Sequence, residues 1–414
     1  MREGDVMKRN IYASLDLGAN TIKLLVSEFV GERQNILFVD EIKSTGIEHG
    51  FIRDKAKVIA DLQKLKGKCE SFLNIKLNSI VLSLPSIELD TKTISNTVTV
   101  NHGRVKGSDI KKMFNEIYEQ EIEQVSSEKR KKEVSAIIPI NFSIGKNKKY
   151  VFFPLNEICR EITMNANLLT LDKQVIISHI TTVEEAGLHV IDIMPNVATY
   201  LYTLLSPEEM TEMSCVVDIG KTATTITILE KGVIIFSEQF SIGGNIITQA
   251  IKDELQLDFE DAEEFKLTHG VCGVGNASDE VIYEKDYGDH APTYITEKDI
   301  AEIVEANYME IMRIVKQYLF EVGVKTKVER FIFIGGATEV RGFLHLIKQT
   351  FGEHSTVRRP SMLGVRHPKY SSAISMHNSI YFFDSLFEEN YEMVTFNKEQ
   401  SQEIDEEEDE KEFI

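Results

Sequence analysis

The sequence predicts an α/β protein built from two similar domains, and three observations carry this prediction. The first is a repeat: the segment LDLGANTIKLLVSE around Asp16 aligns with VDIGKTATTITILE around Asp218, about two hundred residues later. The second is the pattern inside each copy, in which an apolar strand, an Asp-x-Gly turn and an alternating strand follow one another. The third is a later apolar strand that leads into Gly335-Gly336 and a helix expected from about Thr338. A repeat at this spacing is too long for a solenoid and indicates a duplicated domain.

The composition is that of a cytoplasmic globular protein. The chain has 414 residues, more than one ordinary core needs, and 42% of them are hydrophobic. No run approaches the roughly 18 apolar residues that span a bilayer. The net charge of −20 argues against nucleic-acid binding and against adhesion to anionic lipid. The four cysteines form no Cys-x-x-Cys pair and the ten histidines show no ligand spacing, so we expect reduced thiols and no zinc site.

The two Asp-x-Gly turns predict a polyphosphate site. A glycine lets backbone N–H groups approach a ligand, and an Asp at the end of a buried strand is costly to bury without a cation. Two such turns facing one cleft would hold the phosphates, with Asp16 and Asp218 organising a hydrated Mg²⁺. The alternative for a single copy is an ordinary hairpin turn, but two copies that agree beyond the turn favour the ligand site.

Further helices are indicated around the second copy. Gly243-Gly244 precedes an amphipathic helix, whereas neither a Walker-type loop nor a strand-linked Gly-x-Gly-x-x-Gly is present. The glycines of 270–278 are expected to form a loop. Residues 299–322 show helical periodicity, and their apolar stripe is Ile300, Ile303, Val304, Tyr308, Ile311, Val315 and Leu319.

Together these motifs resemble the actin, Hsp70 and sugar-kinase superfamily, and within it the FtsA family over roughly residues 11–385. The resemblance implies an α/β, actin-like two-lobed ATPase fold with duplicated β-sheet cores and an inserted small α+β domain of the FtsA type. The implied parts are a disordered extension (1–10), the first lobe (11–78), the inserted domain (79–164), the first-lobe return with a linker helix (165–205), the second lobe (206–385) and a disordered acidic tail (386–414).

The resemblance also implies a binding site for ATP and Mg²⁺. The expected contacts to the phosphates come from Gly18, Ala19, Asn20 and Thr21 in the first loop and from Gly220, Lys221 and Thr222 in the second. Asp16 and Asp218 would be the metal-organising residues. Glu263 and Lys266 are expected to contact the ribose or the adenine, and Gly335 and Gly336 the adenosine face. Gly243 and Gly244 would let the sugar of the nucleotide pass close to the backbone.

Two departures from the family pattern bear on catalysis. The second loop, usually Asp-x-Gly-Gly-Gly-Thr, is DIGKTAT here, and fewer glycines give its N–H groups less freedom to surround a γ-phosphate. Lys221 either donates to a phosphate oxygen or points to solvent. Met194-Pro195 stands where relatives often have Glu-Pro, so no carboxylate positions the attacking water. We expect ATP binding with slow hydrolysis at most, and no catalytic residue is assigned.

The implied function is that of an actin-like cytoskeletal protein of the bacterial divisome. It would self-associate into filaments and recruit FtsZ, through the FtsZ C-terminal peptide, to the septum at the cytoplasmic face of the membrane. Relatives often have Arg where this chain has Asn307. The basic amphipathic helix with which the family ends is replaced by an acidic segment, 401–414, with a net charge of −7. A membrane protein is therefore the expected indirect anchor, and we predict no lipid binding by this tail alone.

Two alternatives remain within the superfamily. The second copy, with the strand and SIGG that follow it, is also similar to PilM, the cytoplasmic scaffold of type IV pilus machinery. A sugar kinase would need a catalytic Asp base near the first lobe, and no Asp flanked by glycine and aromatic residues is found there.

Overall fold

The computed structural model describes seven stretches of the chain, which fall into two compact units. The described residues are 9–123, 131–145, 149–206, 208–285, 292–324, 327–389 and 391–396. The first unit comprises Met1–Leu204, Ser361–Val365 and Ser372–Ile414, and the second comprises Leu205–Pro360 and Arg366–Ser371. The N-terminal residues 1–8 of the predicted extension and the acidic block 401–414 lie outside the described residues.

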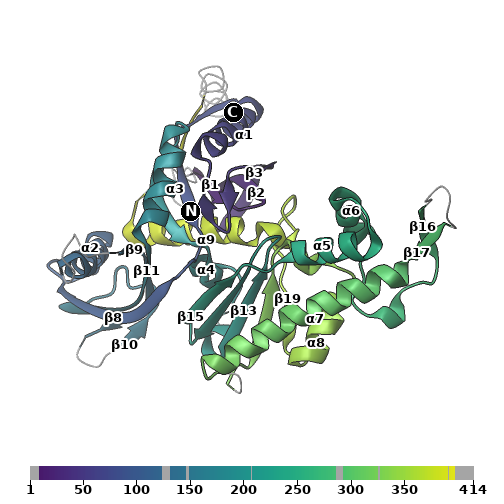
Figure 1. The fold of residues 1–414 in the computed structure, drawn as a ribbon. Helices are drawn as coiled ribbons and strands as arrows, with labels where there is room; N and C mark the ends of the chain where they lie inside the picture. The colour runs from purple at the N-terminus through teal and green to yellow at the C-terminus, as the bar shows by residue number, and fades with distance from the viewer. Residues whose placement is uncertain are drawn as a thin grey trace, which may run out of the picture. The chain divides into compact units, whose positions relative to one another are not determined.

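The first unit is built on a five-stranded sheet (Figure 1). Three strands form an antiparallel meander, and two parallel strands follow on the side of the first strand. In spatial order the strands are β12 (His189–Pro195), β7 (Ser79–Leu84), β1 (Arg9–Leu17), β2 (Thr21–Val30) and β3 (Arg33–Lys43). Short strands lie beside it: β4 (Ile47–Glu48) pairs with β5 (Phe51–Ile52), and β6 (Ile75–Leu77) pairs with β20 (Val394–Phe396).

Helices cover this sheet, and the last of them comes from the C-terminal part of the chain. α1 (Lys55–Leu73) and α3 (Lys173–Glu185) contact each other and the strands. The first turn of α1 begins where the Asp54 side chain accepts a hydrogen bond from Lys57 N. α9 (Ser371–Phe387) lies against the sheet, since the hydroxyl of Tyr12 donates to Asp384 at 2.7 Å. α4 (Asn196–Thr199) and the 3₁₀ turn η1 (Tyr200–Tyr202) end the N-terminal segment of this unit.

A second sheet of four strands is inserted between β7 and α3. Its strands are all antiparallel. In spatial order they are β10 (Lys149–Val151), β9 (Lys132–Ile144), β11 (Glu161–Asp172) and β8 (Asp90–Thr99), and α2 (Gly107–Glu123) packs on them. The separate sheet thus occupies 90–172, whereas β7, inside the predicted insert of 79–164, is a strand of the first sheet.

The second unit repeats the strand plan of the first. An antiparallel meander of three strands is again followed by two parallel strands beside its first strand. In spatial order the strands are β15 (Val233–Phe240), β14 (Thr224–Glu230), β13 (Met213–Ile219), β18 (Arg330–Ile334) and β19 (Ser355–Val357). This duplication confirms the predicted fold class.

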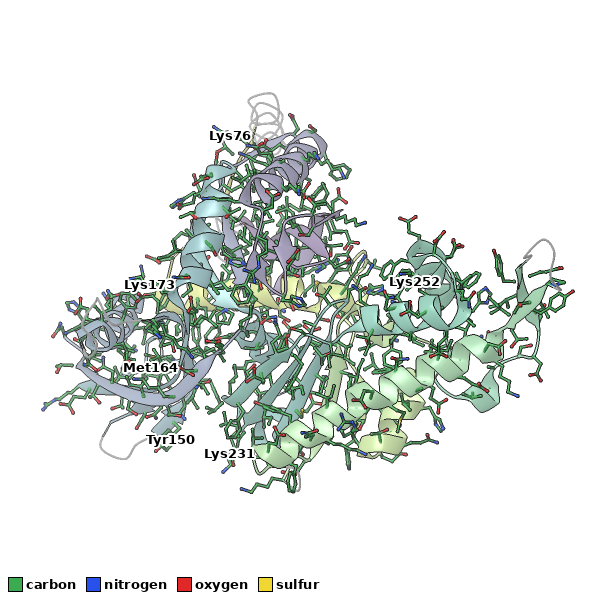
Figure 2. The ribbon with its side chains drawn as sticks, in the orientation of Figure 1. Lys76, Tyr150, Met164, Lys173, Lys231 and Lys252 are labelled. Carbon is green, nitrogen blue, oxygen red and sulfur yellow. The ribbon has the colours of Figure 1, made fainter. Side chains whose placement is uncertain are left out.

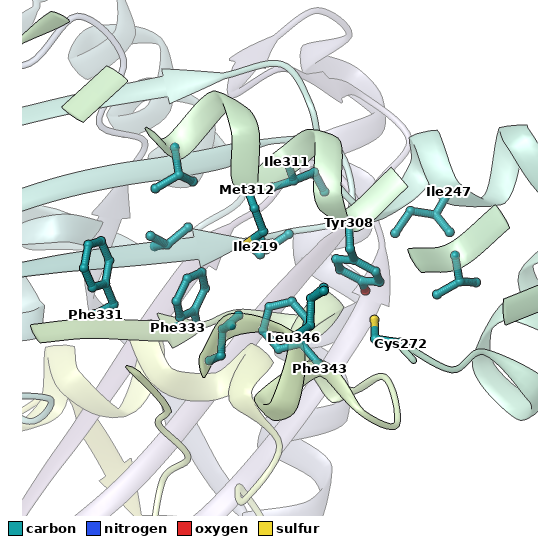
Figure 3. Packing of buried hydrophobic residues seen from close by; sticks show 14 of the residues in the cluster. Ile219, Ile247, Cys272, Tyr308, Ile311, Met312, Phe331, Phe333, Phe343 and Leu346 are labelled. Atoms are coloured by element: carbon teal, nitrogen blue, oxygen red, sulfur yellow. The ribbon is translucent and has the colours of Figure 1, made fainter. Parts of the chain in front are cut away.

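The helices of the second unit close one hydrophobic core. They are α5 (Gly244–Leu255), α6 (Phe259–His269), α7 (Glu297–Glu321) and α8 (Phe343–Phe351), with η2 (Glu209–Thr211), η3 (Val274–Asn276), η4 (Gly336–Glu339), η5 (Pro368–Tyr370) and the hairpin β16 (Val281–Lys285) and β17 (Thr293–Thr296). Every residue of the stripe predicted for 299–322 is buried. Figure 3 shows Tyr308, Ile311 and Met312 of α7 facing Phe333 and Phe343 in this core.

Two local predictions differ from the structure. The helix expected from about Thr338 begins at Phe343, because Gly335 and Gly342 have positive φ values of 92° and 83° and the chain between them forms a 3₁₀ turn. The predicted second lobe ran to residue 385, but the structure groups 361–365 and the described residues from 372 onward with the first unit. Among the described residues no helix is long and apolar enough to cross a membrane.

Candidate functional site

The first loop connects β1 to β2 within the first unit. Gly18 follows the strand end, and a Cβ there would lie 2.8 Å from the carbonyl oxygen of Thr21, so only glycine fits without a shift. The N–H groups of Gly18, Ala19 and Asn20 have no acceptor among the residues that the structure describes. Three successive free donors make this turn able to bind an oxyanion.

Asp16 of this unit has a cationic partner that the sequence reasoning missed. Lys23 stands opposite Asp16 in the β1–β2 register, and its Nζ lies 2.9 Å from Asp16 Oδ2. The two side chains are only 11% and 20% exposed. Oδ1 of Asp16 has no partner in the described part of the chain and is the atom left to face a cation. Counting back from the hairpin turn would have placed Lys23 beside Asp16.

The second loop has the same frame with different side chains. Gly220 N donates to Ala223 O at 2.9 Å, and the N–H groups of Lys221 and Thr222 have no acceptor among the described residues. Opposite Asp218 stands Thr225, not a lysine. Neither loop contains a residue with positive φ. In both loops the glycines therefore allow close approach of the backbone. Their ability to adopt positive φ, on which the expectation from the sequence rests, is not used.

Gly335 and Gly336 lie beside the end of β13. Gly335 has φ of 92°, and a Cβ on it would lie 2.4 Å from both Asp218 Oδ1 and Ile219 O. A side chain at this position would therefore displace the carboxylate. At Gly336 a Cβ would meet only side-chain atoms of Lys369 and His367 at 3.6 and 3.8 Å.

Gly243 and Gly244 hold the second loop against the start of α5. Gly244 N donates to Gly220 O at 2.9 Å, and Asn245 N donates to Lys221 O at 2.7 Å. A Cβ on Gly243 would lie 2.5 Å from Gly220 O, so this contact requires glycine. Asn245 Oδ1 is buried without a partner among the described residues and is therefore an acceptor available to a ligand.

Glu263 and Lys266 form the centre of a buried polar cluster on α5 and α6. Lys266, 6% exposed, donates to Glu263 Oε2 at 2.6 Å, to Thr248 Oγ1 at 2.7 Å and to Gly244 O at 3.2 Å. Thr248 Oγ1 also donates to Glu263. Burial lowers the pKa of Lys266 by more than its pairing with Glu263 raises it. Burial acts to raise the pKa of Glu263, but Lys266, Thr248 and Lys221 outweigh it and hold this pKa below its usual value.

In the structure the side chain of Lys221 extends to α6, to partners that were not considered from the sequence. Its Nζ lies 3.5 Å from Glu263 Oε1 and 6.0 Å from the ring centroid of Phe259, both on α6. The side chain is 29% exposed. Lys221 thus joins the second loop to α6 within the second unit.

The structure therefore brings together, within the second unit, the residues predicted from the second loop onward. Those of the first loop form a separate group in the first unit. The N–H groups of both loops that lack an acceptor among the described residues could donate to a ligand, and Asn245 Oδ1 could accept from one. Within the described residues no group of three or more His, Cys, Asp or Glu side chains is arranged to hold a metal ion. The sequence reasoning missed Lys23, Asn245, Thr248 and Phe259.

Comparisons of the sequence point to one family. A family model described as cell division protein FtsA matches residues 215–375. Over 407 residues the chain is 27% identical to the cell division protein FtsA of Staphylococcus epidermidis, and the alignment covers 97% of this chain and 84% of that protein. The FtsA of Bacillus subtilis is 24% identical to this chain, and the alignment covers 88% of this chain and 82% of that protein. These matches confirm the resemblance inferred from the motifs.

Solved structures show the same fold at low identity. A PilM–PilN type IV pilus biogenesis complex matches with a TM-score of 0.59 and 15% identity, covering 91% of this chain and 99% of that one. MreB5 of Spiroplasma citri bound to ADP matches with a TM-score of 0.55 and 12% identity, covering 91% and 98%. At this identity the likeness establishes the fold alone, which is the actin-like fold.

Proposed function

We propose that this chain, which has the actin-like fold and resembles the FtsA family, binds ATP with Mg²⁺ as a cytoskeletal protein of bacterial cell division. The observation that supports nucleotide binding most strongly is the pair of loops. Each loop follows a strand that ends in Asp-x-Gly, and each presents successive N–H groups without an acceptor among the described residues. Phosphate oxygens are suitable acceptors for such donors.

Different residues of this chain are proposed to bind the phosphates, the ribose and the adenine of the nucleotide. Gly18, Ala19 and Asn20, with Thr21 beside them, bind phosphate through the first loop, and Gly220, Lys221 and Thr222 provide backbone donors in the second. Glu263 and Lys266 are proposed to bind at the ribose and the adenine: Glu263 provides an anionic acceptor, and Lys266, whose three donors bind Glu263, Thr248 and Gly244, holds it in place. Gly243, Gly244, Gly335 and Gly336 leave room for the nucleotide beside the backbone.

A bound Mg²⁺ would neutralise phosphate charge, and Asp16 and Asp218 are the carboxylates proposed to organise it. Magnesium usually keeps several waters and uses one or two protein carboxylates together with phosphate oxygens. Oδ1 of Asp16 is available for this, while Lys23 holds Oδ2.

We propose that hydrolysis is slow. Met194, at the end of β12, provides no carboxylate to position water. Phosphoryl transfer depends almost entirely on positioning and charge stabilisation. A site without a carboxylate to position the attacking water should therefore hydrolyse ATP slowly. Steady-state turnover near the ~10 s⁻¹ of a typical enzyme would contradict this proposal.

The proposed partners are further copies of this chain, in filaments, and the C-terminal peptide of FtsZ. The proposed location is the cytoplasmic face of the membrane at the division site. Asn307, where relatives often have Arg, donates to the carbonyl of Ile303 on its own helix at 2.8 Å. A pull-down with the FtsZ tail in one arm and type IV pilus assembly proteins in the other tests the partner. Capture of FtsZ supports the proposal, and capture of pilus proteins alone contradicts it.

A thermal-shift titration tests nucleotide binding. Mg-ATP should raise the melting temperature, because a ligand at 100 times its Kd stabilises the folded state by about 2.7 kcal/mol. Asp218→Ala should remove most of this shift, while Asp279→Ala, an exposed carboxylate of the same unit, should retain it. Absence of any shift with ATP, ADP and GTP would contradict the proposal.

A further inference from the structure

Lys221 is the side chain of the second loop whose placement the family pattern does not explain. The loop backbone is fixed on α5 by two hydrogen bonds, from Gly244 N to Gly220 O and from Asn245 N to Lys221 O. From this fixed point the side chain extends to α6, where its ammonium pairs with Glu263 and lies over the ring of Phe259. Two attractive contacts therefore hold the ammonium at α6.

The surroundings of this ammonium are those of the Glu263 cluster. Lys266 and Thr248 engage Glu263 Oε2, and Lys221 engages Oε1. Lys221 thus approaches the one oxygen of Glu263 that the buried lysine leaves open. The unassigned N–H groups of Lys221 and Thr222, by contrast, belong to the loop backbone. Backbone and side chain of the same residue therefore serve two different regions.

Moving the ammonium to a terminal phosphate would break both contacts at α6. A partly exposed ion pair with Glu263 and a cation–π contact with Phe259 each favour the position of the ammonium at α6.

We propose that Lys221 is a positioning residue that supports the nucleoside end of the site through Glu263 and Phe259 and does not read the γ-phosphate. This inference rests on the proposed nucleotide binding. It assigns to Lys221 equal contributions to the binding of AMP, ADP and ATP. The ligand class of the site that Lys221 supports is an adenine nucleotide, whatever its number of phosphates.

Calorimetric titration of the full chain with AMP, ADP and ATP tests the proposal. Lys221→Ala should weaken all three affinities by one common factor of about two- to five-fold, the range expected for a partly exposed ion pair. The ratio of the ATP and ADP dissociation constants should stay that of the wild type. Lys221→Arg, which keeps a cation able to pair and to stack, should restore binding. Lys231→Ala removes an exposed lysine from the β14–β15 turn (Figure 2) and should change nothing.

Phe259→Leu gives a second measurement if Lys221→Ala folds poorly. It removes the ring and should again weaken the three nucleotides equally. A loss that grows with the number of phosphates, or unchanged affinities in both variants, overturns the role of Lys221 while nucleotide binding stands. A wild-type chain that binds none of the three nucleotides overturns both proposals.

Discussion

The first and the second loop share one backbone plan and place their charged side chains differently. In each unit an Asp ends the first strand of a meander, and a tight turn leads into the antiparallel second strand. In the first loop the lysine opposite the Asp pairs with it directly. In the second loop that position is Thr225, and the lysine of the turn, Lys221, pairs with Glu263 on α6.

This difference teaches that a duplicated frame fixes the backbone donors but not the electrostatics around them. The first loop carries its cation within its own hairpin, so its charge balance is local. The second loop depends on two helices, α5 and α6, for its support and for the partner of its lysine. Substitutions at distant positions should therefore affect the second loop more than the first.

The largest effect is expected at the helix cluster that supports the second loop. Glu263→Leu leaves Lys266 buried without its carboxylate, and breaking such a pair should cost about 3 kcal/mol of the free energy of unfolding. Chemical denaturation at pH 7 measures this loss. Glu310→Leu, which breaks an exposed pair with Arg313 on α7, should leave the midpoint almost unchanged.

The pH dependence of the same variant sharpens the test. Burial lowers the pKa of Lys266 in the native state, so between that value and the unfolded value of about 10.4 the unfolded state binds more protons. Stability therefore rises as pH increases through this window. Without Glu263 the native pKa falls further, and the rise should be steeper in Glu263→Leu. A flat alkaline profile would contradict the buried charge.

A smaller effect is expected where α5 meets the loop. Gly243→Ala places a methyl group 2.5 Å from Gly220 O, and overpacking of this kind should cost about 2 kcal/mol. Gly275→Ala is the matched control, because its Cβ would meet nothing within 4 Å, and it should change stability by less than about 0.5 kcal/mol. Equal stability of the two variants would show that the loop is not held by α5.

The smallest effect is expected in the first loop. Lys23→Met removes the cation of Asp16 and should cost about 1 kcal/mol, the upper range for a partly exposed pair. Lys43→Met, at the exposed end of the neighbouring strand β3, should cost less. If Lys23→Met destabilises the protein more than Glu263→Leu does, the view that the charges of the first loop are balanced within its own hairpin is wrong.

Much of the fold could be predicted because its signals are local. Alternating apolar residues and turn glycines define both hairpins, and the capping box of Thr296 and Asp299 marks the start of the helix predicted over 299–322. The placement of Lys221 could not be predicted, since its partners lie about forty residues further along the chain. The same holds for α9, whose contacts with Tyr12 and Ser27 join positions more than 300 residues apart.

That return of the chain has a consequence for biosynthesis. Tyr12 bonds to Asp384, and β6 pairs with β20, so the first unit is completed by residues that leave the ribosome long after its own N-terminal strands. At about 5–20 residues per second the delay is on the order of tens of seconds. Apart from residues 366–371, the second unit is continuous from 205 to 360 and can reach its native contacts earlier. During translation the second unit should therefore fold before the first unit is complete.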